Sequence, residues 1–152
     1  MNINRLLLTF LFLLSVPLAQ ADRFTIPYTV VVSSTSGTAI TADRYFIFGD
    51  GANSATEANT QVGAPVNGIV KELRCRTRSA LASDESWTYS LRVNGVTTAL
   101  GCTIGNSAQT CTDLLNTVPV AIGDPLNFLA DNTAGGSPSM IVFCTVVMYD
   151  QR

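Results

Sequence analysis

Histidine is absent from the 152-residue sequence, which removes most of the side-chain chemistry that small hydrolases use. Ser-His-Asp and Cys-His nucleophiles need an imidazole base, and the common zinc hydrolase sites need histidine ligands. A Ser-Lys dyad would depend on Lys71, the one lysine of the chain. Paired carboxylates of the glycosidase kind would combine Glu72 with Asp84 or Glu85, but solvated loop acids give the same pattern. The sequence therefore predicts a protein that is not an enzyme.

Arginines form the most distinctive charge pattern. Arg74, Arg76 and Arg78 alternate along one predicted strand and so share one of its faces. Arg92 joins this row if its own strand lies in the same sheet. Guanidinium groups in a row are suited to clamp sulfate, uronate or phosphate groups on a glycan or an envelope surface. The alternative interpretation is a solvated sheet face whose charges maintain solubility and oppose edge aggregation.

Metal and cofactor sites have little support in the sequence. Asp43, Asp50 and Glu57, or Asp124 with Asp131, supply oxygen ligands for calcium but lack the spacing of a known calcium loop. No phosphate-binding loop or dinucleotide fingerprint occurs. The sequence predicts neither a metal ion nor a cofactor.

The N-terminal residues predict export. Arg5 precedes the apolar stretch "LLLTFLFLLSVPLA", and Ala19-Gln20-Ala21 has the small-x-small pattern that signal peptidase cleaves. A membrane anchor would need about twenty apolar residues. We expect residues 1–21 to be a signal peptide and residues 22–152 to be one domain, secreted or periplasmic and not inserted in a membrane. Its net charge of −3, from eight basic and eleven acidic side chains, argues against nucleic acid as a partner.

The four cysteines, Cys75, Cys102, Cys111 and Cys144, predict two disulfides. An even number of cysteines in an exported chain favours disulfides, and no C-x-x-C pair suggests zinc. Four cysteines allow three connectivities. A short loop at residues 105–108 would place Cys102 opposite Cys111, which favours that pair and leaves Cys75 to bond Cys144.

Apolar and polar residues alternate with period two along most of the mature chain, and this pattern is typical of β-strands. Turn residues separate the strands. We predict an all-β, two-sheet antiparallel sandwich with strands at residues 24–33, 44–48, 68–78, 86–93, 96–104, 109–112, 118–122, 126–130 and 140–149.

One hairpin can be predicted residue by residue. Asn94-Gly95 suits a type I′ turn, which requires positive φ at both positions. This turn fixes the register and pairs Val93 with Val96, Leu91 with Thr98, Tyr89 with Leu100 and Trp87 with Cys102. These side chains share one face, so Trp87 is expected in the core and not as a platform for sugar stacking.

Three segments are apolar on both faces, whereas an antiparallel sandwich usually leaves one face solvated. They are residues 24–32, 45–48 and 140–149. One interpretation is that loops such as residues 49–67 cover the second face; we favour a subunit interface. The predicted interface residues are Tyr28, Phe46, Phe48, Met140, Val142, Phe143, Val147 and Tyr149.

The segments "VNGIVKELRCRTRS", "YSLRVNGVTTALGCTI" and "VPVAIGDPLNFLA" resemble the jelly-roll head domains of the tumour-necrosis-factor-like and complement-type class, in particular the bacterial and phage versions at fibre and filament tips. The matching features are Gly68, the hairpin at residues 91–95 and the pair Gly123-Asp124, within residues 65–149. The resemblance implies a ten-stranded jelly roll, usually trimeric, with the last strand near the threefold axis. Pro125 departs from the pattern, because it removes a backbone donor where a strand should start.

These observations predict a secreted, non-catalytic binding or structural head domain that self-associates, as a homotrimer, and contacts a surface or glycan. The second interpretation is a monomeric carbohydrate-binding module, and the third is a small hydrolase that uses carboxylates. One fold hosts many functions, so the fold alone does not decide among them.

Overall fold

The computed structural model of the chain describes residues 28–34, 44–49, 52–132 and 141–150, with side chains from residue 44 onward. The predicted signal peptide, residues 1–21, lies outside this part. The elements are β1 (Tyr28–Ser34), β2 (Arg44–Phe46), β3 (Asn53–Ser54), the 3-10 helix η2 (Glu57–Thr60), β4 (Val62–Gly63), β5 (Gly68–Thr77), β6 (Ser86–Val93), β7 (Val96–Gly105), β8 (Thr110–Val120), β9 (Pro125–Asn132) and β10 (Val142–Asp150).

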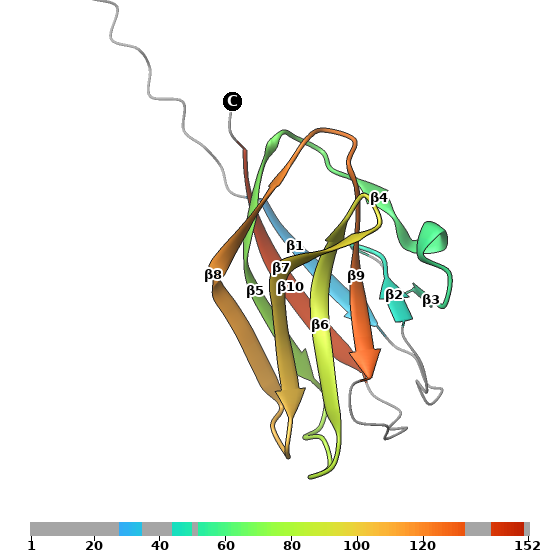
Figure 1. The fold of residues 1–152 in the computed structure, drawn as a ribbon, viewed down its shortest axis with the longest axis vertical. Helices are drawn as coiled ribbons and strands as arrows, with labels where there is room; N and C mark the ends of the chain where they lie inside the picture. Colours follow the sequence, from blue (N-terminus) through green and yellow to red (C-terminus); the bar gives the residue numbers. More distant parts are fainter. Residues whose placement is uncertain (1–27, 35–43, 50–51, 133–140, 151–152) are drawn as a thin grey trace, which may run out of the picture.

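The strands form two antiparallel sheets that face each other (Figure 1). Sheet A has the order β1-β10-β5-β8, and sheet B has the order β3-β2-β9-β6-β7 with β4 also paired to β9. The order β1-β10-β5-β8 against β2-β9-β6-β7 is that of a jelly roll, so the predicted fold class is confirmed. No helix in the described part of the chain has the length and hydrophobicity that a membrane crossing requires.

The core lies between the sheets, and alternation along the strands supplies most of it. In β10 the inward side chains are Val142, Cys144, Val146 and Met148, all at most 3% exposed. Trp87 is fully buried, as predicted. The largest other side chains of this core are Phe46, Leu73, Tyr89, Leu91, Leu100, Ile104 and Phe128.

The β6–β7 hairpin turns at Asn94-Gly95 with φ of 53° and 75°, which confirms the predicted turn. Val93 pairs with Val96 as predicted, but Tyr89 pairs with Cys102 and Trp87 with Ile104, so the predicted register is wrong there by two residues. The cause is a bulge in β7, where the hydroxyl of Thr98 donates to Leu91 O at 2.8 Å. A shift of two keeps every side chain on its predicted face.

Residues that carry the family resemblance connect the turn between β6 and β7 to the turn before β9 through hydrogen bonds. Asn94 Nδ2 donates to Asp124 Oδ1 at 3.0 Å, and Asn94 N donates to Pro125 O at 2.9 Å. Asp124 Oδ2 in turn accepts from Ala121 N, and Gly123 takes a φ of 87°. Pro125 is the first residue of β9, a position where a strand tolerates a missing N–H.

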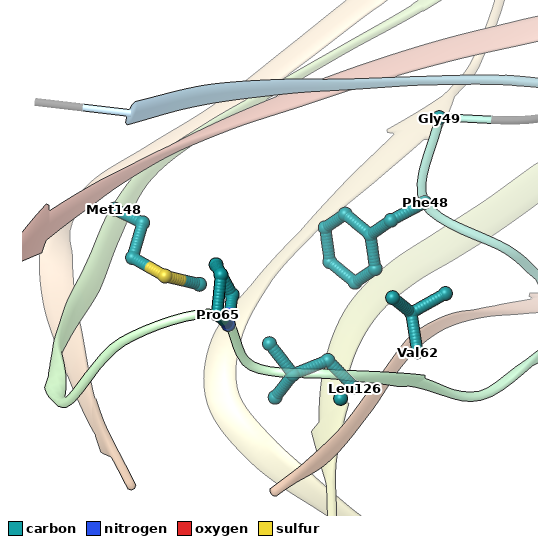
Figure 2. Close-up of a pocket in the computed structure, with 7 residues that line it drawn as sticks. Phe48, Gly49, Val62, Pro65, Leu126 and Met148 are labelled. Carbon is teal, nitrogen blue, oxygen red and sulfur yellow. The ribbon is translucent and has the colours of Figure 1, made fainter. Parts of the chain in front are cut away.

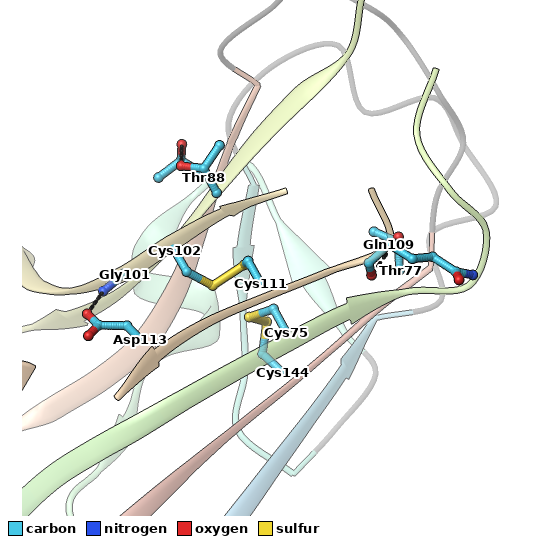
Figure 3. Close-up of a disulfide and its surroundings, with 10 residues drawn as sticks. Cys75, Thr77, Thr88, Gly101, Cys102, Gln109, Cys111, Asp113 and Cys144 are labelled. Carbon is cyan, nitrogen blue, oxygen red and sulfur yellow. Dashed lines mark hydrogen bonds between the residues drawn. A yellow bond between two sulfur atoms is a disulfide. The ribbon is translucent and has the colours of Figure 1, made fainter. Parts of the chain in front are cut away.

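The disulfides are Cys75–Cys144 and Cys102–Cys111, which confirms the predicted connectivity (Figure 3). Cys75 is the register partner of Cys144 on β10 and of Cys111 on β8, so three cysteines lie in one row across sheet A. Cys102 lies on β7, in sheet B. The prediction that Cys102 and Cys111 oppose each other in one hairpin is therefore wrong: β7 and β8 are the edges of different sheets, and their disulfide joins the two layers.

Candidate functional site

Sheet A presents a regular array of polar side chains on its outer face. Register places Thr112, Arg74 and Thr145 in one row across β8, β5 and β10. The next row contains Thr110, Arg76 and Phe143. We call these six residues the arginine half of the face. They lie around a hollow of ≈ 400 Å³ whose floor includes Cys75 and Cys111.

The charge of the arginine half is only partly balanced. Arg74 Nη2 lies 3.5 Å from Glu72 Oε2, in an ion pair whose arginine side chain is 54% exposed. Glu72 lies at a bulge in β5 with a φ of 60°, and its carboxylate is on the same side of the sheet as Arg74. Arg76 is exposed and makes no ion pair within the described residues. The hollow is therefore electropositive.

Arg78 and Arg92 do not belong to this array. Arg78 follows the end of β5 and does not line the hollow. Arg92 lies on β6 in sheet B, so the prediction that it extends the row is wrong. Its guanidinium donates to both carboxylate oxygens of Glu57, at 2.6 and 2.9 Å, and to Gly95 O, and it lies 5.4 Å from the ring centre of Tyr45. The bond to Glu57 raises the pKa of Arg92.

Arg92 thus fixes η2 against the outer face of sheet B, and its replacement should cost stability. We expect Arg92→Lys to lower the free energy of unfolding by about 1–2 kcal/mol, because an ammonium group cannot bond both oxygens of Glu57 in the same geometry. Urea unfolding measures this difference. Arg78→Lys is the matched control and should change stability by less than about 0.5 kcal/mol. Equal losses in the two variants would contradict this role of Arg92.

Part of the predicted self-association surface lies in the chain's own core. Phe46 and Val142 are 1% and 3% exposed, because they lie on the inner faces of β2 and β10. Phe48 packs its ring against Phe128, with 4.9 Å between the centroids. The prediction of Phe46 and Val142 as interface contacts is therefore wrong, because both are buried within one chain. Phe48 is only partly buried, so its place in an interface stays a prediction.

The other predicted interface residues divide into two groups. Phe143, Val147 and Tyr149 lie on the outer face of sheet A, and Phe143 is 43% exposed. Met140 and the side chain of Tyr28 lie outside the described residues. Residues 52–63, from the loop of the alternative interpretation, form β3, η2 and β4 along sheet B. They cover the second face of β2, as that interpretation expected, but not the outer face of sheet A.

The sequence reasoning missed a bulge in β8 that exposes two leucines. Between the pairs Lys71–Thr117 and Leu73–Asp113, the segment 114–116 has no partner on β5. Leu114 and Leu115 are 51% and 92% exposed there. Apolar side chains this exposed lose the stabilisation that burial would give them, so a covering partner would lower their free energy.

Asp113 holds this bulge in place. Its carboxylate accepts hydrogen bonds from the N–H groups of Leu115, Asn116 and Gly101, at 3.1 Å each, and from Asn116 Nδ2 at 2.8 Å. The bond from Gly101 on β7 crosses between the sheets (Figure 3). Burial alone would raise the pKa of Asp113, but these four hydrogen bonds together lower it. Asp113 therefore stabilises both the bulge and the contact between β7 and β8.

The leucines adjoin the second part of the sheet A face. Register places Tyr149, Ile69 and Pro119 in one row, and Val147 beside Lys71 in the next. Lys71 Nζ lies over the Tyr149 ring, 4.2 Å from its centre. We call the apolar members of this surface the apolar half; they are Ile69, Leu114, Leu115, Pro119, Val147 and Tyr149.

A separate pocket of ≈ 240 Å³ opens between β4 and β10 (Figure 2). Its lining residues are Phe48, Gly49, Val62, Gly63, Pro65, Leu126 and Met148. None of these side chains carries a charge or a hydrogen-bonding group, so the pocket can accept an apolar group but offers no catalytic residue.

Two of the three candidate hydrolase carboxylates, Glu72 and Glu85, have structural partners. Glu72 accepts a hydrogen bond from Tyr149 Oη at 3.3 Å and pairs with Arg74. Glu85 accepts from Ala82 N in the loop before β6, far along the chain from the bulge in β5. Of the considered calcium ligands, Glu57 is bound to Arg92, and Asp43 and Asp50 lie outside the described residues.

Three sulfur atoms, those of Cys75, Cys102 and Cys111, lie within 4.8 Å of one another. Each is bonded in a disulfide, so these atoms are not thiolate ligands for a metal ion.

No protein-family model and no curated protein sequence matches the chain. Among solved structures, a chain of the acid-stable capsid of Helicobacter pylori bacteriophage KHP30 is similar with a TM-score of 0.52 and 11% identity, over 82% of this chain and 87% of that one. The globular domain of zebrafish complement 1qA has a TM-score of 0.49 and 11% identity, over 82% and 96%. Murine APRIL has a TM-score of 0.42 and 13% identity, over 80% and 99%.

These identities are low, so the likeness concerns the fold and not the function. The strand order of the two sheets agrees with it. The chain has a jelly-roll fold, which its strand order shows and which the likeness to the phage capsid chain supports.

Proposed function

We propose that this protein is a secreted, non-catalytic head domain that self-associates as a homotrimer through the apolar half of sheet A. The observation that carries the proposal is the pair Leu114 and Leu115, which Asp113 holds out from the edge of β8. A fixed apolar projection next to an apolar sheet face suits a partner of the same kind, because each copy supplies both surfaces. Three copies is the number that the family resemblance implies.

Export is the second part of the proposal. The predicted signal peptide and the two disulfides support it, because disulfides persist in oxidising compartments. The role as a head domain follows from the fold resemblance and from the lack of an assembled catalytic group among the described residues. A surface or a glycan is the proposed contact, with the arginine half as the part of sheet A that an interface over the apolar half leaves open.

Light scattering of the purified, oxidised protein tests the assembly. We expect three times the mass of one chain at micromolar concentration, and the mass of one chain for Leu114→Ser combined with Leu115→Ser. The matched control combines Val96→Ser with Ile122→Ser, since these side chains are 65% and 66% exposed at the far turns. The control should keep the wild-type mass.

A wild-type mass of one chain would overturn the trimer and favour the second function, a monomeric carbohydrate-binding module. The arginine half is the specific observation that supports this second candidate, because it needs no second copy to form.

A further inference from the structure

We infer that the arginine half of sheet A binds an acidic oligosaccharide, that is, a chain of sugars that carries carboxylate or sulfate groups. The inference rests on the proposed role in surface contact and names the class of ligand. It depends on a combination of side chains that the sequence alone did not bring together: two guanidinium groups, three hydroxyls and one exposed aromatic ring around a single hollow.

The spacing of the cations suits a repeating anion. Arg74 and Arg76 are two positions apart on one strand, which separates their Cα atoms by about 6.6 Å along β5. Both guanidinium groups project on the outer face and are exposed. A guanidinium binds carboxylate or sulfate through two parallel hydrogen bonds. Because Glu72 balances part of the charge of Arg74, Arg76 is the stronger anion contact of the two.

The neighbours of the arginines favour a sugar over a bare anion. Phe143 is the register partner of Arg76, and its ring is 43% exposed although the other face of β10 is buried. An aromatic ring beside a cation can pack against the apolar face of a pyranose while the cation binds its acidic group. Thr110, Thr112 and Thr145 flank the arginines and supply hydroxyls that donate and accept hydrogen bonds.

The shape of the site also suits an extended ligand. The hollow of ≈ 400 Å³ is shallow and lies on an open sheet face, so a chain of sugars can cross it and continue at both ends. Among the described residues the other basic side chains form no second array near the hollow: Lys71 lies over the Tyr149 ring, Arg78 stands outside the hollow, and Arg92 is bound to Glu57 in the other sheet. The charge is therefore local, which distinguishes this site from the broad basic field of nucleic-acid binding.

Fluorescence anisotropy with labelled hexasaccharides tests the inference at constant ionic strength. The probes are an oligogalacturonate, which carries carboxylates, a heparin fragment, which carries mainly sulfates, and maltohexaose, which is neutral. We expect at least one acidic probe to bind and maltohexaose not to bind. The acidic probe that binds identifies the anionic group. Binding of neither acidic probe, or equal binding of maltohexaose, would overturn the inference.

Three variants separate specific binding from general charge attraction. Arg76→Ala should lower the affinity for the acidic probe at least about tenfold, and Phe143→Ala should lower it about fivefold. Arg78→Ala removes the same charge outside the hollow and should change binding less than about twofold. Equal losses for Arg76→Ala and Arg78→Ala would overturn the site. An unchanged affinity in Phe143→Ala, together with full displacement by inorganic sulfate at constant ionic strength, would show an anion site and overturn the sugar ligand.

The same titration on the Leu114→Ser, Leu115→Ser variant distinguishes this inference from the proposed assembly. Acidic-sugar binding by a variant with the mass of one chain supports the site independently of the trimer. If the wild type binds the acidic sugar and this variant does not, the inference that the arginine half of a single chain forms the site would be overturned.

Discussion

Replacing both cysteines of the Cys75–Cys144 disulfide with serine is expected to lower the free energy of unfolding by about 4 kcal/mol, the largest effect of any change considered for this protein. This disulfide closes a loop with a sequence separation of 69 residues, whereas Cys102–Cys111 closes one of 9. In the chain-entropy account the longer loop restricts the unfolded chain more. The Cys102→Ser, Cys111→Ser variant should therefore lose less, about 2.5–3 kcal/mol.

The cysteines must be replaced in pairs, because the two disulfides lie close together. Cys75 is the register partner of both Cys144 and Cys111, and its sulfur lies within 4.8 Å of the sulfurs of Cys102 and Cys111. A single Cys144→Ser change would leave the Cys75 thiol beside the other disulfide, where thiolate attack can exchange the bonds. Double variants remove this route and give each disulfide its own value.

Urea unfolding of the oxidised double variants at neutral pH measures the two losses, with the m-value checked for constancy. A larger loss from the Cys102–Cys111 pair would contradict the loop-length argument. It would show instead that the bond between the edges of the two sheets contributes more than its loop length indicates, through the native contact of β7 with β8.

The fold class and the inward faces could be predicted because they depend on the local period of two. Ser86–Val93 was predicted at its observed bounds, and Trp87, Tyr89 and Leu91 lie in the core as expected. The register failed beyond the first pairs because a regular ladder was assumed. The hydroxyl of Thr98, which bonds Leu91 O, gives no signal in the sequence that distinguishes it from any other strand threonine.

Strand β8 shows why the exposed leucines were missed. The sequence predicted two strands, residues 109–112 and 118–122, with a gap between them. One strand spans both because Asp113 accepts hydrogen bonds from backbone N–H groups two and three residues on. This is the Asx pattern of an aspartate that stabilises a local turn. The "DLLN" segment contains this signal, since aspartate before apolar residues in a gap suggests a fixed turn that exposes them.

The candidate site could be predicted in part because one strand contains both of its cations. Alternation places Arg74 and Arg76 on one face without knowledge of the sheet. The assignment of Arg92 failed because strand order is a non-local property, and β5 and β6 are consecutive strands in different sheets. Phe143 was predicted on an apolar surface, but the register of β10 against β5 places it beside Arg76.

The predicted interface was too large for a related reason. A sequence that is apolar on both faces of a strand predicts that both faces are buried. It does not predict whether the same chain or a second copy buries them. For β2 the second face is covered within the chain, since Tyr45 lies beneath Arg92, which η2 holds through Glu57. Helix η2 has no hydrophobic periodicity that could have revealed this contact. For β10 no described element outside the sheets lies on that side, which is why the proposal of self-association remains confined to sheet A.

Replacing Asp113 should have the second-largest effect, about 3 kcal/mol for Asp113→Ala at pH 7. The change leaves the N–H groups of Gly101, Leu115 and Asn116 without their acceptor in a region where the side chain is only 8% exposed. Gly101 also lets β7 approach β6 closely, since a Cβ there would lie 2.9 Å from Ser90 Oγ and 3.1 Å from Tyr89 O. The variant should also lose mass in light scattering, because the leucines of the bulge are no longer fixed.

The dependence on pH identifies the carboxylate as the cause. Because the pKa of Asp113 is lowered in the folded protein, its charge contributes stability that is fully present above the unfolded value near 3.9 and is lost as pH falls through the folded value below it. Asp113→Asn keeps the shape and removes the charge, so we expect its free energy of unfolding to be about 2 kcal/mol below that of the wild type at pH 7. This gap between the two proteins should narrow below about pH 4.

Urea unfolding of both proteins at pH 7, 4 and 2.5 measures the gap. Other carboxylates titrate in both proteins, so their contributions cancel in the difference. Asp84→Asn is the matched control, since Asp84 is exposed in a loop and its replacement should change stability by less than about 0.5 kcal/mol at pH 7. A gap for Asp113→Asn that stays constant down to pH 2.5 would mean that its loss comes from altered packing, and the ionised carboxylate would then not be what holds Leu114 and Leu115 at the edge of β8.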